Sequence, residues 1–389
     1  MIRFKILAAL PLFVVATASI ASAQTTYIAF GDSITEGFGD DDPARVAPDD
    51  KGYPARLEDL LENSGRAADV ENHGFGGERT VDAVTRIVPI LATAGSGDVL
   101  LLMEGTNDIS RNIGLETTIF NLDEMASRAE RRGIQVVHAT VIPRLPEAET
   151  DQNNYLTQQL NGLIRNLAGV RQRGLADPFE VFLREPNLFA RLYANASNDP
   201  VGHPNGAGYD VLADVFFDVL TGVDSVPPVH GVMRPVNGQR GVQPGTVIDV
   251  DVWDFGQGID LSATSLLVNG QVVPATITGD AKRIELLYQP PQPLSGSVSI
   301  GLRSRDLATP PNTVDREIAR FRTAGTALLD GDLNEDGRVD GTDLVSFAVH
   351  FGAGRGERRF ERAADFNEDG RIDGQDLAAL AANFGRSSF

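Results

Sequence analysis

The sequence contains no cysteine, which excludes a disulfide framework and a lipid-modified cysteine. It is also short of basic residues, because 34 Lys and Arg stand against 54 Asp and Glu and give a formal net charge of −20. A nucleic acid is bound by clustered Lys and Arg that release counterions, and an anionic surface repels an acidic protein. We therefore expect no nucleic-acid partner.

Long apolar runs are scarce, and the one that stands out lies at the start of the chain. Arg3 and Lys5 precede a largely apolar run over residues 6–20, which Ala21-Ser22-Ala23 follows in the pattern of a cleavage site. We therefore expect residues 1–23 to be a signal peptide and the protein to be secreted. No later stretch approaches the roughly 20 apolar residues of a membrane helix, so we expect no membrane insertion.

A chain of 389 residues exceeds the usual size of one hydrophobic core, so several domains are expected. Residues 25–222 alternate short apolar runs with amphipathic stretches, which predicts strands and crossover helices. The predicted strands are 27–30, 68–72, 98–103 and 134–140. The predicted helices are 55–63, 81–92, 117–132, 154–168 and 207–220. This pattern predicts a three-layer α/β/α domain with a flavodoxin-like parallel sheet.

The composition changes after residue 222, and residues 226–325 are rich in Pro, Gly, Val and Thr. Short alternating segments at 246–252, 265–268, 283–288 and 297–303 are separated by turn signals such as Asn269-Gly270. The pattern predicts a β-sandwich. The segment 254–260 and the pair Arg305-Asp306, which precedes a turn, resemble bacterial immunoglobulin-like domains.

Polar and glycine-rich clusters follow the predicted strands of the first domain. Gly31-Asp32-Ser33 follows the first strand and places a hydroxyl at its carboxyl end, where open α/β sheets bind ligands. Residues 72–77 follow the second strand, and Gly105-Thr106-Asn107-Asp108 follows the third. A fourth cluster, residues 199–205, precedes the last predicted helix and contains His203.

These four clusters, in this order, resemble the SGNH or GDSL hydrolase family. The resemblance implies that Ser33 is the nucleophile and His203 the base. It also implies an oxyanion hole formed by the backbone N–H groups of Ser33 and Gly77 and the side chain of Asn107. A serine hydroxyl needs an adjacent base to attack an acyl carbon, and prepositioned donors stabilise the charge that develops on the oxygen. No cofactor is expected for catalysis.

The acid that orients His203 is the one departure from the family pattern. The family has an aspartate three residues before its histidine, whereas Asp199 lies four residues before His203 and Pro200 takes the expected place. Asp199 reaches the ring if the chain bulges by one residue, and a backbone carbonyl is the alternative.

Other polar residues of this domain have simpler interpretations. His138 lies in an apolar strand as a core residue, and His73 is more readily part of a glycine-rich turn than a substrate contact. Asp32 and Asp108 are expected to form loop hydrogen bonds. The absence of Gly-x-Ser-x-Gly disfavours an α/β-hydrolase elbow, and no pair of histidines has the spacing of metal ligands.

Near the C-terminus the chain repeats itself, since the segments that start at Asp332 and Asp365 agree at most positions. Each places oxygen-bearing side chains at loop positions 1, 3, 5, 9 and 12 and glycine at 6, which predicts a calcium loop. The predicted ligands of the first loop are Asp332, Asn334, Asp336, the Arg338 carbonyl, Asp340 and Asp343. Those of the second are Asp365, Asn367, Asp369, the Arg371 carbonyl, Asp373 and Asp376.

Aspartate at position 12 of each loop, with a helix after it, resembles a type I dockerin over residues 330–389. This resemblance implies two calcium ions, a cohesin-bearing scaffold partner and polysaccharide as the setting. We therefore expect a secreted esterase that hydrolyses carboxylic esters through an acyl-enzyme, with acetylated polysaccharide as the favoured substrate. Two alternatives remain open at this point. One is a lipase or lysophospholipase, and the other is a binding or scaffold protein whose hydrolase domain is degenerate.

Overall fold

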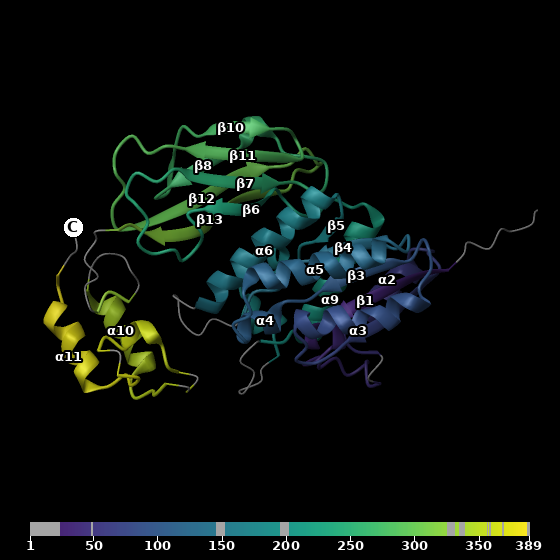
Figure 1. The fold of residues 1–389 in the computed structure, drawn as a ribbon, viewed down its shortest axis with the longest axis horizontal. Coiled ribbons are helices and arrows are strands. Elements are labelled where there is room, and N and C mark those ends of the chain that lie inside the picture. The colour runs from purple at the N-terminus through teal and green to yellow at the C-terminus, as the bar shows by residue number, and fades with distance from the viewer. Residues whose placement is uncertain are drawn as a thin grey trace, which may run out of the picture.

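The structure is a computed structural model of the chain (Figure 1). It describes residues 24–47, 50–144, 152–194, 202–324, 331–333, 339–355, 357, 359–367 and 369–386. The predicted signal peptide lies outside these residues. No helix of the described part is long and apolar enough to cross a membrane.

The first domain is built on a five-stranded sheet in the order β2-β1-β3-β4-β5. Its strands are β1 Thr25–Gly31, β2 Ala68–Gly74, β3 Val99–Met103, β4 Gln135–Ala139 and β5 Gly174–Ala176. Every pairing is parallel, and β1 pairs with both β2 and β3. The chain therefore reverses its direction of progress across the sheet at β1, which makes the carboxyl ends of β1 and β3 a topological switch point.

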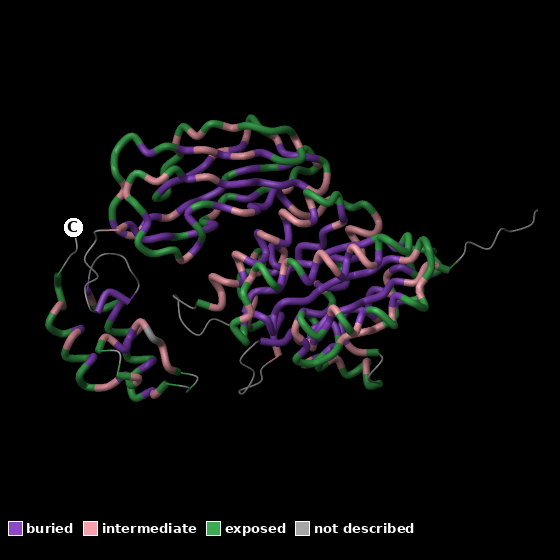
Figure 2. Tube along the Cα trace, viewed as in Figure 1, coloured by how far each residue is buried: buried purple, intermediate pink, exposed green. Residues whose placement is uncertain are grey.

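Helices cover both faces of this sheet. On one face lie α2 Gly52–Asn63 and α9 Gly206–Thr221, and on the other lie α3 Thr80–Thr93, α5 Leu115–Glu130 and α6 Gln152–Arg171. Because adjacent strand residues point to opposite faces, Ala29 and Leu101 join the core under α2 and α9, whereas Phe30 and Leu100 join the core under α3 and α5. The buried sheet between two helical layers is visible in Figure 2. The predicted α/β/α fold is confirmed.

Short helices fill the connections between these elements. They are α1 Ser33–Glu36, α4 Thr106–Ser110, α7 Pro178–Leu183 and α8 Leu188–Leu192. The first two begin within a residue or two of the ends of β1 and β3, so the polar clusters at Ser33 and Asn107 enter helices at one edge of the sheet.

The second domain consists of two four-stranded sheets, in the orders β10-β11-β7-β6 and β13-β12-β8-β9. Its strands are β6 Val229–Arg234, β7 Ile248–Trp253, β8 Ser265–Val268, β9 Gln271–Val272, β10 Thr276–Gly279, β11 Arg283–Tyr288, β12 Ser297–Arg305 and β13 Thr313–Arg322, and a 3-10 turn, η2, spans Leu261–Ala263. All strand pairs are antiparallel. Both sheets contribute to one core, in which Val250 and Leu286 join Leu302 and Ile318.

Polar and close backbone contacts attach this second domain to the first. The indole Nε1 of Trp253 donates to Oδ1 of Asn166 on α6 at 2.7 Å. Helix α6 also packs on β6, where a Cβ on Gly162 would lie 2.5 Å from the carbonyl oxygen of Gly231, so the close approach requires glycine. Figure 1 shows β6 and α6 side by side at this junction.

The C-terminal segment contains α10 Gly341–His350, the 3-10 turn η3 Arg362–Ala364 and α11 Gly374–Asn383. The two helices enclose a small core that includes Val339, Phe347, Ile372 and Leu380. Each begins with a capping box in which the aspartate at the N-cap and the aspartate three residues later exchange hydrogen bonds with the backbone.

Candidate active site

The candidate nucleophile lies where β1 turns into α1. Asp32 caps this short helix, because its Oδ1 accepts a hydrogen bond from the backbone N–H of Ile34 at 2.9 Å. A Cβ on Gly31 would lie 2.4 Å from the carbonyl oxygen of Met103, so glycine is required where β1 and β3 run closest together. Ser33 follows directly and is therefore held at the switch point of the sheet.

The structure brings Ser33 and His203 together across 170 residues of sequence, with Oγ of Ser33 2.8 Å from Nε2 of His203. Backbone contacts fix the segment that carries the histidine. Its carbonyl oxygen accepts from the N–H of Ala194 at 2.8 Å, and the neighbouring Asn205 caps α9. The imidazole edge packs on the ring of Phe38 with centroids 4.6 Å apart. The imidazole is thus held within hydrogen-bond distance of the hydroxyl.

Asn107 reaches the same edge of the sheet from the end of β3. Asn107 lies in α4, two residues after Gly105, whose φ of 122° favours glycine. Only 8% of the surface of Asn107 is exposed. Its side-chain amide donates to Oδ2 of Asp32 at 3.4 Å, which places the amide beside the residue that precedes Ser33. Burial raises the pKa of Asp32 to about 6.

Gly77 lies in the loop that follows β2. Its φ of 76° is in the left-handed region, and the nearest atom to a Cβ there would be a nitrogen of Arg111 at 3.7 Å, so the backbone conformation rather than space favours glycine. The strand end that leads into this loop lies against α1, since a Cβ on Gly74 would lie 2.0 Å from the backbone nitrogen of Glu36. The N–H of Phe75 also donates to the carbonyl oxygen of Gly31 at 2.9 Å.

A buried carboxyl lies beneath this edge of the sheet, and sequence reasoning missed it. Glu104 is 1% exposed, and among the described residues neither of its oxygens has a hydrogen-bond partner. Burial, with the nearby carboxylates of Asp32 and Glu78, raises the pKa of this carboxyl well above its usual range. The signal in the sequence was a glutamate that directly follows the apolar strand 99–103.

The competing histidines and Asp108 have other partners. Nε2 of His138 lies 3.3 Å from Arg173, and burial lowers the pKa of this histidine to about 3, so it is a neutral core residue. Nε2 of His73 lies 2.8 Å from a carboxylate oxygen of Glu71. Asp108 accepts hydrogen bonds from the start of α3 and from α5, which is the loop role expected of it.

Asp199, the candidate that orients His203, lies outside the described residues. Its role therefore stays a prediction, as does the alternative of a backbone carbonyl.

A cavity of about 570 Å³ opens at the end of α1, the helix that begins with Ser33, and Phe38 in its wall packs on His203. The segment after Ser33 and the ends of neighbouring loops line it: Glu36, Gly37, Phe38, Gly39, Val46, Lys51, Asn72 and Gly74. Phe38 is 59% exposed, and Phe75 in the loop after β2 is 58% exposed. The surface next to the candidate nucleophile thus combines polar side chains with exposed aromatic rings.

The candidate calcium loops are described in part, because Asn334, Asp336 and Arg338 lie outside the described residues. The last carboxylate of each loop, Asp343 or Asp376, is fully buried and accepts a backbone N–H from the start of its own loop at 2.8 Å. The remaining predicted ligands that the structure describes are Asp332, Asp340, Asp365, Asn367, Asp369, Arg371 and Asp373.

The second loop shows an oxygen suited to a cation. Oδ1 of Asp365 is buried without a hydrogen-bond partner among the described residues, while its Oδ2 accepts from the N–H of Gly370 at 2.9 Å. An inward carboxylate oxygen that no protein donor satisfies is costly unless something else binds it. The donor set is all oxygen, which fits a hard cation such as calcium.

Two parts of the chain match profiles of known protein families. A profile of the GDSL-like lipase/acylhydrolase family matches residues 29–211, and a profile of the dockerin type I domain matches residues 330–384. Uncharacterized protein YpmR of Bacillus subtilis (strain 168) is 24% identical over 216 residues, which are 49% of this chain and 80% of that protein.

Two solved structures are similar to part of the chain. A member of the lipolytic protein G-D-S-L family from Veillonella parvula is 23% identical with a TM-score of 0.42, over 51% of this chain and 99% of that chain. Axe2, an acetylxylan esterase from Geobacillus stearothermophilus, is 21% identical with a TM-score of 0.42, over 50% of this chain and 94% of that chain. The two profile matches show that the chain carries a domain of the GDSL-like lipase/acylhydrolase family at residues 29–211 and a type I dockerin domain at residues 330–384.

Proposed function

We propose that this chain is a serine esterase that hydrolyses carboxylic esters, with Ser33 as nucleophile and His203 as general base. The observation that carries the proposal is the 2.8 Å contact between Oγ of Ser33 and Nε2 of His203. A general base acts when it lies within hydrogen-bond reach of the proton it removes, about 2.6–3.2 Å between heavy atoms. The contact joins two segments far apart in the sequence, at the edge of the sheet where α/β folds bind ligands.

The reaction proceeds in two half-reactions. Oγ of Ser33 attacks the carbonyl carbon of the ester while its proton passes to Nε2 of His203, and a tetrahedral intermediate forms. This intermediate collapses as His203 returns the proton to the leaving alcohol oxygen, which leaves an acyl group on Ser33. A water molecule then gives a proton to His203 and attacks the acyl carbon. This second intermediate collapses as His203 returns the proton to Oγ of Ser33, which breaks the acyl–serine bond and releases the carboxylic acid. Asp199 is our candidate for the group that orients the imidazole.

The negative charge that develops on the carbonyl oxygen needs donors that are already in place. We assign this role to the backbone N–H groups of Ser33 and Gly77 and to the side-chain amide of Asn107. The amide of Asn107 makes only a long bond of 3.4 Å to Asp32, so a developing oxyanion offers it a better acceptor. Burial of this amide strengthens such a bond, because little water competes for it.

Replacement of Asn107 by alanine should lower kcat by about 10²- to 10³-fold, the usual cost of losing one oxyanion donor. The measurement is steady-state hydrolysis of an aryl acetate, with the melting temperature as the check on folding. Asn63, which is exposed at the end of α2, provides a matched control as Asn63→Ala. If Asn107→Ala folds and turns over at the rate of that control, the oxyanion role of Asn107 is wrong.

The favoured substrate class is an acetylated polysaccharide. The proposal rests on the dockerin domain, since dockerins attach carbohydrate-active enzymes to cohesin-bearing scaffolds. It is supported by the cavity beside the candidate nucleophile, where Glu36, Lys51 and Asn72 offer the charged and amide groups that bind sugar hydroxyls. An aromatic ring such as that of Phe38 offers an apolar face to a sugar.

A lipase or lysophospholipase is the second candidate. Phe38 and Phe75 favour it, because two aromatic side chains exposed by more than half next to the nucleophile also suit an acyl chain. In a polysaccharide esterase the exposed rings would contact the sugar, whereas in a lipase they would contact the acyl chain. Acyl-chain length therefore distinguishes them.

With a panel of acetylated xylo-oligosaccharides, aryl esters of increasing chain length and lysophospholipids, kcat/KM should be highest for acetyl esters and fall as the acyl chain lengthens. The physical reason is that Glu36, Lys51 and Asn72 give the cavity a polar lining, which suits a sugar hydroxyl better than a long acyl chain. Ser33→Ala, assayed with each substrate, corrects for background hydrolysis. A kcat/KM that rises with chain length would instead identify a lipase.

We further propose that the dockerin loops bind two calcium ions and that the domain docks on a cohesin of a scaffold protein outside the cell. The all-oxygen donor set and the buried, unpaired oxygen of Asp365 support the calcium sites. Exposed apolar residues on the two helices, among them Val345 and Val349 on α10 and Leu377 on α11, support a protein partner. The proposed export rests on the N-terminal pattern at residues 1–23.

A further inference from the structure

Three aspartates meet at a place that the esterase site and the dockerin loops do not include. Asp224 lies in the linker between α9 and β6, Asp254 follows β7, and Asp306 follows β12. One carboxylate oxygen of each lies within 4.8 Å of one oxygen of each of the others. Oxygens that share one calcium ion at about 2.3–2.6 Å lie no more than about 5 Å apart, so a single ion can contact all three.

One of these carboxylates has an oxygen that no protein donor satisfies. Asp254 is 3% exposed, and among the described residues its Oδ2 has no hydrogen-bond partner. Its other oxygen, Oδ1, accepts from the N–H groups of Gly256 at 2.9 Å and Gly258 at 2.6 Å, which fixes the carboxylate in place. A buried and unpaired carboxylate oxygen destabilises the folded state, and a bound cation offsets this loss of free energy.

No cationic side chain of the described residues lies within salt-bridge distance of the three carboxylates. In the first domain, two buried aspartates do have arginine partners, Asp40 with Arg56 at 2.6 Å and Asp177 with Arg165 at 2.7 Å. The ammonium of Lys282, the nearest lysine, instead donates to a backbone carbonyl. The cluster therefore concentrates negative charge without a protein counter-ion in contact.

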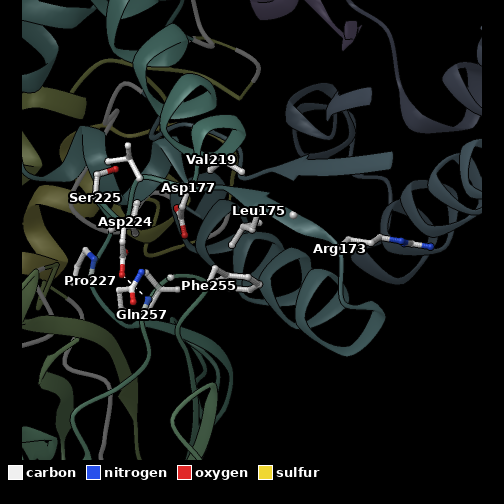
Figure 3. A pocket seen from close by; sticks show the side chains of 15 residues that line it. Arg173, Leu175, Asp177, Val219, Asp224, Ser225, Pro227, Phe255 and Gln257 are labelled. Carbon is white, nitrogen blue, oxygen red and sulfur yellow. Dashed lines mark hydrogen bonds between the residues drawn. The ribbon is translucent and has the colours of Figure 1, made fainter. Parts of the chain in front are cut away.

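The loops around the cluster hold the carboxylates at short range. Oδ2 of Asp224 accepts from the N–H of Gln257 at 2.6 Å, drawn as a dashed line in Figure 3. A Cβ on Gly256 would lie 2.1 Å from the Asp224 carboxyl group, so only glycine permits this approach. The side-chain amide of Asn312 donates both to Oδ2 of Asp306 at 2.6 Å and to the carbonyl oxygen of Asp224 at 3.0 Å.

The cluster also adjoins solvent. A cavity of about 330 Å³ at the β5 edge of the first domain is lined by Asp224, Ser225, Phe255 and Gln257 (Figure 3). The carboxylate of Asp224 is only partly buried, whereas those of Asp254 and Asp306 are buried. An ion can therefore enter from this side and keep water ligands, which calcium commonly does.

We propose that Asp224, Asp254 and Asp306 form a third cation site, of the calcium type, at the junction of the hydrolase domain and the β-sandwich. Asp224 belongs to the linker that leaves the hydrolase domain, and the other two belong to the sandwich. The bound ion therefore ties the linker to the sandwich and limits the movement of one domain against the other.

The charge of the cluster supports this role. At neutral pH the three carboxylates repel one another, and a divalent cation offsets this repulsion.

The single tryptophan of the chain reports on this site and not on the dockerin. Trp253 directly precedes Asp254 and is packed against α6 through its bond to Asn166. Calcium chloride added to the chelator-treated full chain should produce a saturable change in tryptophan fluorescence. Asp254→Asn should lose this change and bind one calcium ion fewer per chain, measured by metal analysis after equilibrium dialysis.

Three variants complete the experiment. Asp315→Asn, an exposed aspartate of β13, should behave as wild type, and the double variant Asp343→Asn, Asp376→Asn should lose dockerin calcium but keep the fluorescence change. Asp224→Asn, in the linker, replaces Asp254→Asn if the latter does not fold. The proposal is overturned if wild type and Asp254→Asn bind equal numbers of ions, or if the fluorescence change disappears in the dockerin variant and persists in Asp254→Asn.

Discussion

Ser33→Ala in the full chain should lower ester turnover by a factor on the order of 10⁴ to 10⁶, because an acyl-enzyme cannot form without the hydroxyl. Activity does not fall to the level of water alone, since the remaining oxyanion donors still bind the substrate. The measurement is kcat for an aryl acetate under saturating conditions, with all protein quantified by its absorbance.

The substitution should leave the fold intact. The side chain of Ser33 loses one oxygen, and the cap at the start of α1 comes from Asp32 and not from Ser33. Ser64→Ala, which removes a hydroxyl at the end of α2, is the matched control and should turn over as wild type. If Ser33→Ala keeps the turnover of this control, the assignment of the nucleophile is wrong. If wild type itself shows no turnover, the degenerate-hydrolase alternative gains support.

His203→Gln should lower kcat/KM by a comparable factor, on the order of 10⁴ to 10⁶, since nucleophile and base act as one unit. Glutamine is close to histidine in size and can still hydrogen-bond to Ser33, but its amide cannot take up the proton of the hydroxyl. The expected loss therefore reports on proton transfer and not on packing against Phe38. The measurement is kcat/KM for the same aryl acetate.

His73→Gln tests the competing histidine of the same edge of the sheet. His73 is paired with Glu71, so this variant should keep the turnover of wild type. If activity is instead lost in His73→Gln and kept in His203→Gln, the base is His73 and our assignment of His203 is wrong. A double variant Ser33→Ala, His203→Gln should be no slower than either single variant, as expected for residues that act together.

The parallel sheet was predictable because its strands are buried on both faces and form short apolar runs between amphipathic helices. The run 99–103 is an example, with every residue of β3 buried. Strand β5 was not predicted, because three residues are too few to show a period. Strand β13 was also missed, because a register shift in its pairing with β12 interrupts the alternation of buried and exposed residues.

The candidate site was predictable to the extent that its residues follow strand ends. The resemblance to the SGNH or GDSL family implied that Ser33 and Asn107 act together, and both follow strands whose carboxyl ends share one edge of the sheet. Glu104 was missed, because a buried carboxyl looks in sequence like a surface residue at the end of a strand. The cluster of Asp224, Asp254 and Asp306 was missed for another reason: it joins a linker to two strand ends, and no spacing in the sequence relates the three.

The central claim, that His203 activates Ser33, is tested most directly by covalent labelling with a fluorophosphonate, which reacts only with an activated serine hydroxyl. Peptide mass spectrometry of the labelled full chain should find one modified residue, Ser33, and no modification in His203→Gln. Labelling of a different serine, or equal labelling of Ser33 in wild type and His203→Gln, would contradict the account.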